Sequence, residues 1–254
     1  MPEQLVVERR AAVYEITINR PEQRNALNAE VREGLFTAFR AAQADDACRV
    51  VIVTGAGERS FSAGADLKEM ARLNLKVPPR DFTPRLGRNV HLDKPVIAAV
   101  NGAAYAGGFL LAQMADLCVA STTASFCIAE AKWGRGAPWS TPLASMLPRR
   151  VYTELLVLAE PISARRAYEL GLVNRLVEPT DLMTEARAMA DRICANAPLT
   201  IRGHLDVVKL AYETGERAAE EAADAIFAPI YNSLDAAEGP AAFREGRKPR
   251  WQGK

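Results

Sequence analysis

Three short and nearly uninterrupted apolar runs recur in the first half of the chain. They are VVIVTG (50–55), VIAAV (96–100) and DLCVA (116–120). Runs of this length, without polar alternation, are typical of strands that are buried on both faces, as in a parallel sheet covered by helices. Stretches long enough for a loop and a helix lie between the first two. This order predicts an α/β fold built on a buried sheet.

The segment before these runs predicts a hairpin and a helix. LVVERR (5–10) and AVYEITIN (12–19) are rich in β-branched residues, and the second alternates apolar with polar side chains. Asn28 is a suitable N-cap for the stretch that follows. The apolar positions of that stretch recur at helical spacing and fall on one face: Val31, Leu35, Phe39 and Ala42.

The later chain changes character. Residues 72–85 contain three prolines and no periodicity, which predicts a loop. From about residue 180 onward the pattern is helical, starting with a predicted cap at Thr180 and Asp181. We therefore expect a core over 1–195 and a helical region over 196–254, whose apolar faces need a partner surface.

Composition excludes several classes of protein. Lys plus Arg number 32 and Asp plus Glu 31, so the basic excess expected of a nucleic-acid-binding protein is lacking. The cysteines are far apart in sequence, and both histidines lack ligands at metal-binding spacing: Cys48, Cys118, Cys127, Cys194, His91 and His204. We predict reduced thiols, no metal site and a cytoplasmic location. The apolar window 95–112 is interrupted by Asn101 and by glycines, so we expect a strand, a turn and a helix there rather than a membrane span.

Two glycine-rich turns are the first sign of chemistry. FSAGADLKEM (61–70) and NGAAYAGGFLLAQMAD (101–116) each place small residues where a strand gives way to a helix. Small residues let a ligand approach the backbone, and the start of a helix offers unpaired N–H groups. Taken singly, each turn is compatible with simple close packing. Facing each other, the two turns could offer two N–H donors to one oxygen, which is the arrangement of an oxyanion hole.

Together these segments resemble the crotonase family of enoyl-CoA hydratases and isomerases. The resemblance rests first on FSAGADLKEM followed by KPVIAAVNGAAYAGG (94–108). Further segments agree with the family in the same order, from about Val13 to Trp251: NRPEQRNALN (19–28), SFCIAEAKWG (125–134), PISARRAYELGLVNRLV (161–177) and EGPAAFREGRKPRW (238–251). Chance does not account for so many motifs in one order.

The resemblance implies a fold and a substrate class. It implies a spiral of ββα repeats with a helical C-terminal trimerisation region, assembled as a homotrimer or a dimer of trimers. The implied substrate is an acyl-CoA thioester, with coenzyme A as part of the substrate and no further cofactor or metal. By the match of motifs, Ala65 and Gly107 would donate the two backbone N–H groups to the thioester oxygen.

One departure from the family bears on the reaction. Members commonly carry two glutamates, and their positions are Leu110 and Glu130 in this chain. Glu130 alone would be the acid–base group, in an apolar pocket lined by Leu110 and Trp133 that raises its pKa. Hydration usually employs two carboxylates, whereas one carboxylate can shuttle a proton between carbons, as in the family's isomerases. The alternatives to such an enzyme are a catalytically silent acyl-CoA-binding protein and, on the same scaffold, a thioester hydrolase or a lyase.

The resemblance also suggests where the rest of the thioester is held. The substrate would be contacted by Ala63, Asp66, Leu67 and Lys68, and Lys68 would lie near the 3′-phosphate of coenzyme A. In the C-terminal motif, basic residues of a neighbouring subunit would reach the same phosphate, namely Arg247 and Lys248, although Gly246 replaces the family's usual lysine. The segment 134–150 departs most from the family. This segment contains Pro138, Trp139 and Pro142 and directly follows Trp133. Aromatic residues and prolines in this arrangement predict either an unusual acyl pocket or core packing.

Overall fold

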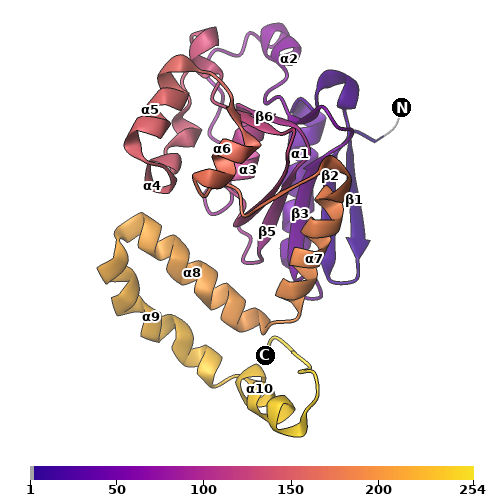
Figure 1. Ribbon diagram of the computed structural model, residues 1–254, viewed down its shortest axis with the longest axis vertical. Helices are drawn as coiled ribbons and strands as arrows, with labels where there is room; N and C mark the ends of the chain where they lie inside the picture. The colour runs from indigo at the N-terminus through magenta and orange to yellow at the C-terminus, as the bar shows by residue number, and fades with distance from the viewer. Residues whose placement is uncertain (1–2) are drawn as a thin grey trace.

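The computed structural model describes residues 3–254, and its N-terminal half is a succession of strands and helices (Figure 1). Strands β1 (Leu5–Arg10) and β2 (Val13–Ile18) pair in antiparallel fashion and lead into helix α1 (Ala29–Ala44). The Asn28 side chain accepts a hydrogen bond from the backbone N–H of Val31, at 3.1 Å. The predicted hairpin, helix and N-cap are therefore confirmed.

The larger sheet has six strands in the order β1-β2-β3-β5-β7-β10. Its central members are the three apolar runs, which form β3 (Val50–Gly55), β5 (Val96–Val100) and β7 (Leu117–Ser121). They pair in parallel with one another, and β10 (Arg175–Val177) pairs in parallel with β7. Every residue of β3 and β5 is buried, so the prediction of strands covered on both faces is confirmed.

A second sheet of four short strands runs alongside the first. It has the order β4-β6-β8-β9, with β4 (Ser60–Ser62), β6 (Ala103–Tyr105), β8 (Ser125–Cys127) and β9 (Ile162–Ser163). Each of the pairs β3/β4, β5/β6 and β7/β8 contributes one strand to each sheet, and this alternation is the expected ββα spiral. Each glycine-rich turn leads from a strand into a helix, as expected, but that strand is a separate three-residue strand, β4 or β6, which the sequence pattern did not indicate. Such strands are too short to show a periodic pattern.

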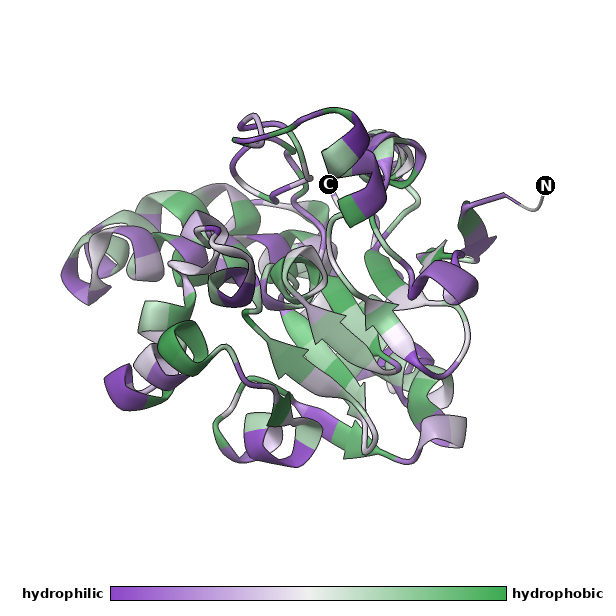
Figure 2. Ribbon diagram, turned by 90° about the horizontal axis from the view of Figure 1, so that it is seen from above, coloured by the Kyte–Doolittle hydropathy of each residue, from purple (hydrophilic) through white to green (hydrophobic). Residues whose placement is uncertain are grey.

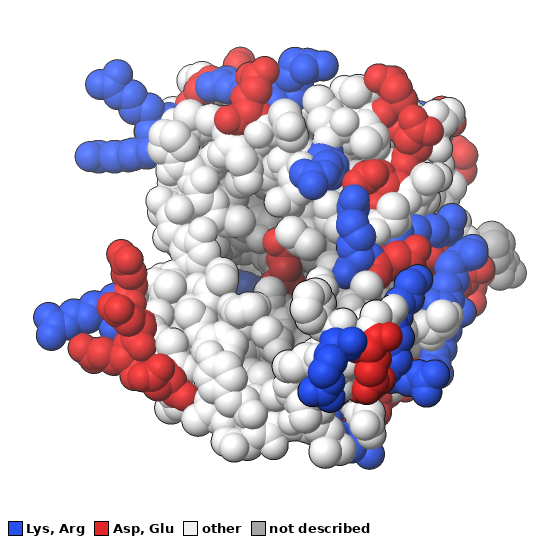
Figure 3. All heavy atoms as spheres, turned by 60° about the horizontal axis from the view of Figure 1, so that its bottom comes forward, with Lys and Arg blue, Asp and Glu red and all other residues white. Residues whose placement is uncertain are grey.

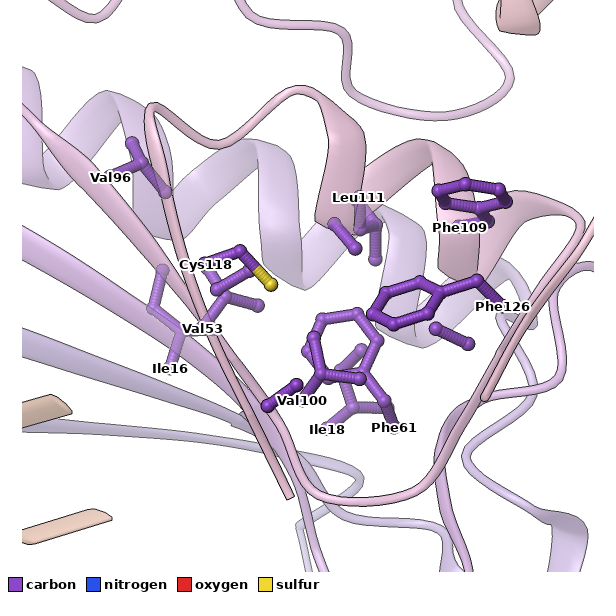
Figure 4. Close-up of a cluster of buried hydrophobic side chains, with 14 of the residues drawn as sticks. Ile16, Ile18, Val53, Phe61, Val96, Val100, Phe109, Leu111, Cys118 and Phe126 are labelled. Atoms are coloured by element: carbon purple, nitrogen blue, oxygen red, sulfur yellow. The ribbon is translucent and has the colours of Figure 1, made fainter. Parts of the chain in front are cut away.

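The six-stranded sheet divides its side chains between two apolar clusters. Val51 and Val53 of β3 point toward the main core with α1 and the second sheet, while Val50 and Ile52 point toward helix α7 (Leu182–Cys194). This alternation follows from the two-residue period of a strand. Figure 4 shows part of the main core, where Phe61 lies beside Ile18 and Val100 of the sheet and Phe126 lies between Phe61 and Phe109. Figure 2 shows the hydrophobic strands at the centre.

The remaining short helices of the first 180 residues connect the strands. They are α2 (Leu67–Arg72), α3 (Gly107–Gln113), α4 (Leu143–Met146), α5 (Arg149–Leu158) and α6 (Ala164–Glu169), together with 3-10 helices η1 (Pro21–Gln23), η2 (Glu130–Trp133), η3 (Pro138–Ser140) and η4 (Pro179–Asp181). The proline-rich segment 72–85 forms a loop after α2, as predicted. The predicted helix start at Thr180 and Asp181 is confirmed in position, because Asp181 is the N-cap residue of the helix that begins at Leu182. Both residues lie in η4, however, and the Asp181 side chain makes no capping hydrogen bond.

The chain ends in three further helices, α8 (Pro198–Thr214), α9 (Glu216–Tyr231) and α10 (Leu234–Glu245). The first two form a hairpin that projects below the sheets in Figure 1. The C-terminal tail returns to α10, where the Asp235 carboxylate accepts hydrogen bonds from the backbone N–H groups of Gln252 and Gly253, at 2.7 and 2.9 Å. The expected helical character of this region is confirmed.

Other expectations concern isolated side chains. Cys48, Cys118 and Cys127 are buried and Cys194 is half-buried, all as free thiols. Both histidines are exposed, and no cluster of potential metal ligands occurs among residues 3–254. Within the same residues, none of the helices has the length and apolar character needed to cross a membrane.

Candidate active site

The two glycine-rich turns lie side by side because the strands before them are neighbours. β4 and β6 pair in parallel, with Ser62 opposite Ala104, so the turns that follow them emerge at the same end of the small sheet. The contact is so close that a Cβ atom on Gly64 would lie 2.8 Å from the backbone nitrogen of Gly107. A Cβ atom on Gly107 would lie 3.6 Å from the nitrogen of Ala65. The structure thus brings the two predicted N–H donors together.

Both N–H groups are available to a ligand. Leu27 pairs with the turn on either side of Ala65: its N–H donates to the Gly64 carbonyl at 2.8 Å, and its carbonyl accepts from Asp66 N–H at 3.3 Å. Gly107 is the first residue of α3 and therefore has no partner within that helix. Among the hydrogen bonds formed within residues 3–254, neither Ala65 N–H nor Gly107 N–H takes part. Two neighbouring free donors of this kind can stabilise charge on one oxygen.

Local backbone strain accompanies this arrangement. Gly64 has a φ of +88°, and Ala106 has a φ of +49°, which is uncommon for a residue with a side chain. The backbone N–H of Ala106 donates to the carbonyl of Cys127 on β8, at 2.9 Å. Neighbouring strands thus hold the turn in a conformation that it would rarely adopt alone.

The early loop fixes the first turn from behind. Arg20 donates to the carbonyl of Ala26 at 2.6 Å and forms an ion pair with Asp66 at 3.0 Å. The Asp66 carboxylate also accepts hydrogen bonds from the N–H groups of Lys68 and Glu69, and so caps α2. Burial raises the pKa of Asp66, but these hydrogen bonds outweigh that effect and bring the pKa below its usual value. The Asp66 side chain is therefore engaged in holding the loop.

Glu130 lies at the same end of the small sheet as the two turns. β8 pairs in parallel with β6, with Tyr105 opposite Cys127, and Glu130 follows as the first residue of the 3-10 helix η2. Its Oε1 accepts a hydrogen bond from Nε1–H of Trp139, at 2.6 Å. Its Oε2 is buried and has no hydrogen-bond partner among residues 3–254. Burial raises the pKa of Glu130, and the Trp139 hydrogen bond lowers it in part.

The apolar surroundings of this site differ from the sequence prediction. Leu110 is 5% exposed and lies one turn along α3 from Gly107. Trp133, which was expected to line the pocket over Glu130, is 64% exposed. The tryptophan against Glu130 is Trp139, which the sequence left open between pocket and core. Its ring also packs edge-on against Phe109, with 6.1 Å between centroids.

The residues expected around coenzyme A fall into two separate groups. Ala63 is half-buried, and Leu67 and Lys68 are exposed on the first turn of α2. Arg247 and Lys248 follow α10, and in Figure 1 α10 and α2 lie at opposite ends of the molecule. One chain therefore does not bring the two groups together.

Arg247 is also engaged within its own region. Its guanidinium forms ion pairs with Glu238 at 2.6 Å and with Glu245 at 2.6 Å. These hydrogen bonds raise the pKa of Arg247 above its ordinary value and lower that of Glu238 to about 2. The role of Arg247 that the structure describes is to hold the chain after α10, whereas Lys248 is exposed.

Two surface cavities lie elsewhere. One of about 340 Å³ lies between the core and the start of α8, and its lining includes Lys94 and Arg202. Another of about 510 Å³ lies between α1 and the loop after α2, and its lining includes Phe36 and Phe82. Neither is lined by Ala65, Gly107 or Glu130, so neither belongs to the site described above.

Comparison with known proteins agrees with these features. The family model described as enoyl-CoA hydratase/isomerase matches residues 8–254. The carnitinyl-CoA dehydratase of Salmonella agona is 38% identical over the full length of both chains. The crystal structure of an enoyl-CoA hydratase from Mycobacterium tuberculosis superposes with a TM-score of 0.91 at 38% identity, covering 99% of this chain and 100% of the other. A carnitinyl-CoA hydratase from Mycobacterium avium gives a TM-score of 0.76 at 37% identity, with full coverage of both chains.

The family match spans nearly the whole chain, and the fold superposes on that of an enoyl-CoA hydratase over 99% of this chain. The chain belongs to the enoyl-CoA hydratase/isomerase family.

Proposed function

We propose that this protein binds an acyl-CoA thioester and moves a proton at the carbon next to the thioester carbonyl. The N–H groups of Ala65 and Gly107 would hold the thioester oxygen, and Glu130 would be the acid–base group. The observation that carries the proposal is the free, buried Oε2 of Glu130 at the same sheet end as two unpaired N–H donors. A carboxylate whose pKa is raised by burial is suited to accept and return a proton near neutral pH.

The proposed reaction with a 3-enoyl-CoA proceeds in two proton transfers. Glu130 takes a proton from C2, and the electron pair moves onto the thioester oxygen, where two N–H donors stabilise the negative charge. Protonated Glu130 then returns the proton to C4, and the double bond moves from C3–C4 to C2–C3. Only a proton and electron pairs within the substrate move, so this reaction needs neither a redox cofactor nor a metal.

Elimination of water is the second candidate, because the Salmonella and Mycobacterium relatives carry the names carnitinyl-CoA dehydratase and hydratase. In that reaction Glu130 would take the C2 proton of a 3-hydroxyacyl-CoA and return it to the leaving hydroxyl. A single carboxylate can perform both transfers if the proton and the hydroxyl leave from the same face. Leu110, which is buried on α3, offers no second carboxylate to the water.

A substrate panel in D₂O tests the proposal. The panel contains 2-enoyl-, 3-enoyl- and 3-hydroxyacyl-CoA thioesters, among them carnitinyl-CoA, and products are followed by mass and absorbance. Double-bond migration with deuterium entering the carbon chain supports the first candidate, and loss of water supports the second. Free coenzyme A would indicate a hydrolase. Tight binding without turnover or deuterium exchange would contradict an enzymatic role and indicate a silent acyl-CoA-binding protein.

Replacing Leu110 by glutamate is expected to raise water addition to 2-enoyl-CoA modestly. Acid–base assistance is worth about 10²–10⁴ in rate when the geometry is correct. Burial of a second carboxylate near Glu130 raises its pKa and costs several kcal/mol, which offsets much of that gain. The measurements are the initial hydration rate with crotonyl-CoA and a melting curve. A folded variant that binds the thioester but hydrates no faster than the parent would show that position 110 does not face the reacting carbons.

We also propose that the protein assembles as a homotrimer or a dimer of trimers through its C-terminal helices. These helices expose large apolar side chains, including Val208 at 53%, Tyr212 at 62% and Phe243 at 90%. Figure 3 views the molecule with the C-terminal helices turned forward: charged side chains gather at the edges, and a broad uncharged surface surrounds a central hollow. Exposed apolar surface of this extent is typical of an interface.

Light scattering coupled to gel filtration at micromolar concentration is expected to give three or six chains per particle. The variant Phe243→Ser is expected to weaken the assembly, because a large side chain that is fully buried at the centre of an interface contributes about 2 kcal/mol or more when it is one of the few dominant contacts. A stable monomer in the parent protein would contradict the proposal.

A further inference from the structure

Trp139 forms the only side-chain hydrogen bond to Glu130 within residues 3–254. It lies in η3 (Pro138–Ser140), within the segment 134–150 whose sequence departs most from the family motifs, and its Nε1–H donates to Oε1 at 2.6 Å. We infer that Trp139 is a positioning residue: it holds Oε1 of Glu130 and thereby leaves Oε2 as the oxygen that takes and returns the substrate proton. The inference rests on the proposed acid–base role of Glu130.

Trp139 is itself held through its backbone and through its ring. The side-chain amide of Gln113 on α3 donates to the carbonyl of Trp139 at 2.6 Å. Phe109, also on α3, packs edge-on against the indole, and Phe126 of β8 lies 5.3 Å from Phe109 between ring centroids. The helix that begins at Gly107 therefore fixes the tryptophan that fixes Glu130. This arrangement couples the position of the carboxylate to that of the proposed oxyanion hole.

The unpaired oxygen distinguishes Glu130 from the other shielded carboxylates. Each of the others has an arginine or backbone N–H groups as partners: Glu15 with Arg187, Glu69 with Arg32, Asp66 with Arg20, and Asp235 with Gln252 and Gly253. Among carboxylates of residues 3–254, only Glu130 has a buried oxygen without a partner. A buried acceptor without a partner is costly, and in a native protein it points to a role that the free chain does not fulfil.

The tryptophan stabilises the carboxylate without adding a charge. The charged and titratable groups on the segments that flank Glu130 are Cys127 on β8 and Lys132 on η2. Helix α5, which packs on η2, carries Arg149, Arg150, Tyr152 and Glu154. Within residues 3–254 no basic side chain forms an ion pair with Glu130. A formal positive charge would hold the carboxylate ionised and make it a weak base. A neutral N–H opposes the effect of burial only in part, so Oε2 retains its affinity for a proton.

The variant Trp139→Phe removes the N–H and keeps an aromatic ring against Phe109. Burial raises the pKa of Glu130, and the hydrogen bond from Trp139 lowers it. When that hydrogen bond is removed, the pKa rises further, and a larger fraction of the carboxylate is protonated at low pH. We expect kcat/KM for the best substrate to fall roughly tenfold at pH 6 and to approach the parent value near pH 9. The measurement is the pH dependence of kcat/KM for parent and variant between pH 5.5 and 9.

Two further variants make the test specific. Trp251→Phe is the matched control, since it also removes an indole N–H, which donates to the carbonyl of Ala195 at 2.8 Å outside the site. It is expected to leave the acid limb of the profile in place. Gln113→Met releases the carbonyl of Trp139 and is expected to move the acid limb in the same direction as Trp139→Phe, by less.

The outcomes separate the inference from the proposed function. If Trp139→Phe lowers kcat/KM equally at all pH values, or leaves it unchanged, Trp139 merely packs and the inference is wrong. If Glu130→Gln retains full activity, the proposed acid–base role is wrong, whatever Trp139 does. Should Trp139→Phe fold poorly, as judged by circular dichroism, the acid limb of Gln113→Met decides: an unmoved limb overturns the inference.

Discussion

Replacing Glu130 by glutamine is expected to lower kcat about 10²–10⁴-fold, which is the usual contribution of a positioned acid–base group. The amide keeps the shape of the side chain and can still accept from Trp139 Nε1–H through its oxygen, so the affinity for acyl-CoA should change little. The measurements are single-turnover rates with the best substrate of the panel and the Kd for a non-reactive thioester. Loss of both rate and affinity would instead indicate that the loop after β8 had rearranged.

A matched control for this substitution is Glu160→Gln. Glu160 is an exposed glutamate after α5, and its replacement removes one charge without touching the site. Its activity is expected to equal that of the parent. If Glu130→Gln turns over as fast as this control, Glu130 is not the acid–base group and the assignment of the site fails.

Replacing Gly64 by alanine is expected to lower kcat/KM about 10²–10³-fold, the loss associated with one missing oxyanion-hole donor. The added Cβ would lie 2.8 Å from the Cβ of Ala106 and from the nitrogen of Gly107, so one turn must move away from the other. The positive φ of +88° adds a backbone cost, and we expect the free energy of unfolding to fall by about 1–3 kcal/mol or more. Rates and urea unfolding curves provide the two measurements.

Gly171→Ala is the control that separates backbone strain from the loss of the donor pair. Gly171 has a φ of +81°, close to that of Gly64, but no atom lies within 4 Å of its ideal Cβ position. Its replacement should cost about 1 kcal/mol of stability and leave the rate unchanged. Equal rate losses in the two variants would show that general destabilisation, rather than separation of Ala65 and Gly107, explains the effect.

The long, regular elements were predictable from the chain because they repeat a local pattern. Val50–Gly55 and Val96–Val100 are apolar at consecutive positions, and burial on both faces of a strand is the usual reason for such a run. Val31, Leu35 and Phe39 recur at helical spacing and are fully buried on α1. The short strands β4, β6 and β8 were not predicted, since three residues contain no period that distinguishes a strand from a turn.

The site was predictable only in part. Glycine-rich turns and one glutamate in a matching segment pointed to Ala65, Gly107 and Glu130, but they did not indicate what surrounds the carboxylate. Trp133 and Trp139 are six residues apart in a segment with several prolines and glycines, where no regular element relates the directions of their side chains. Burial of Trp139 depends on Phe109 and Gln113, which precede it by more than twenty residues.

The sequence by itself determined the α/β class, the family and the two turns that carry the unpaired N–H groups, because each is encoded in contiguous residues. Only the tertiary structure decided that the turns adjoin, that Arg20 and Asp66 hold one of them, and that Trp139 rather than Trp133 donates to Glu130. These are contacts between residues far apart along the chain. They arise from the parallel pairing of β4, β6 and β8, which aligns three segments at one sheet end, and local pattern contains no information on that alignment.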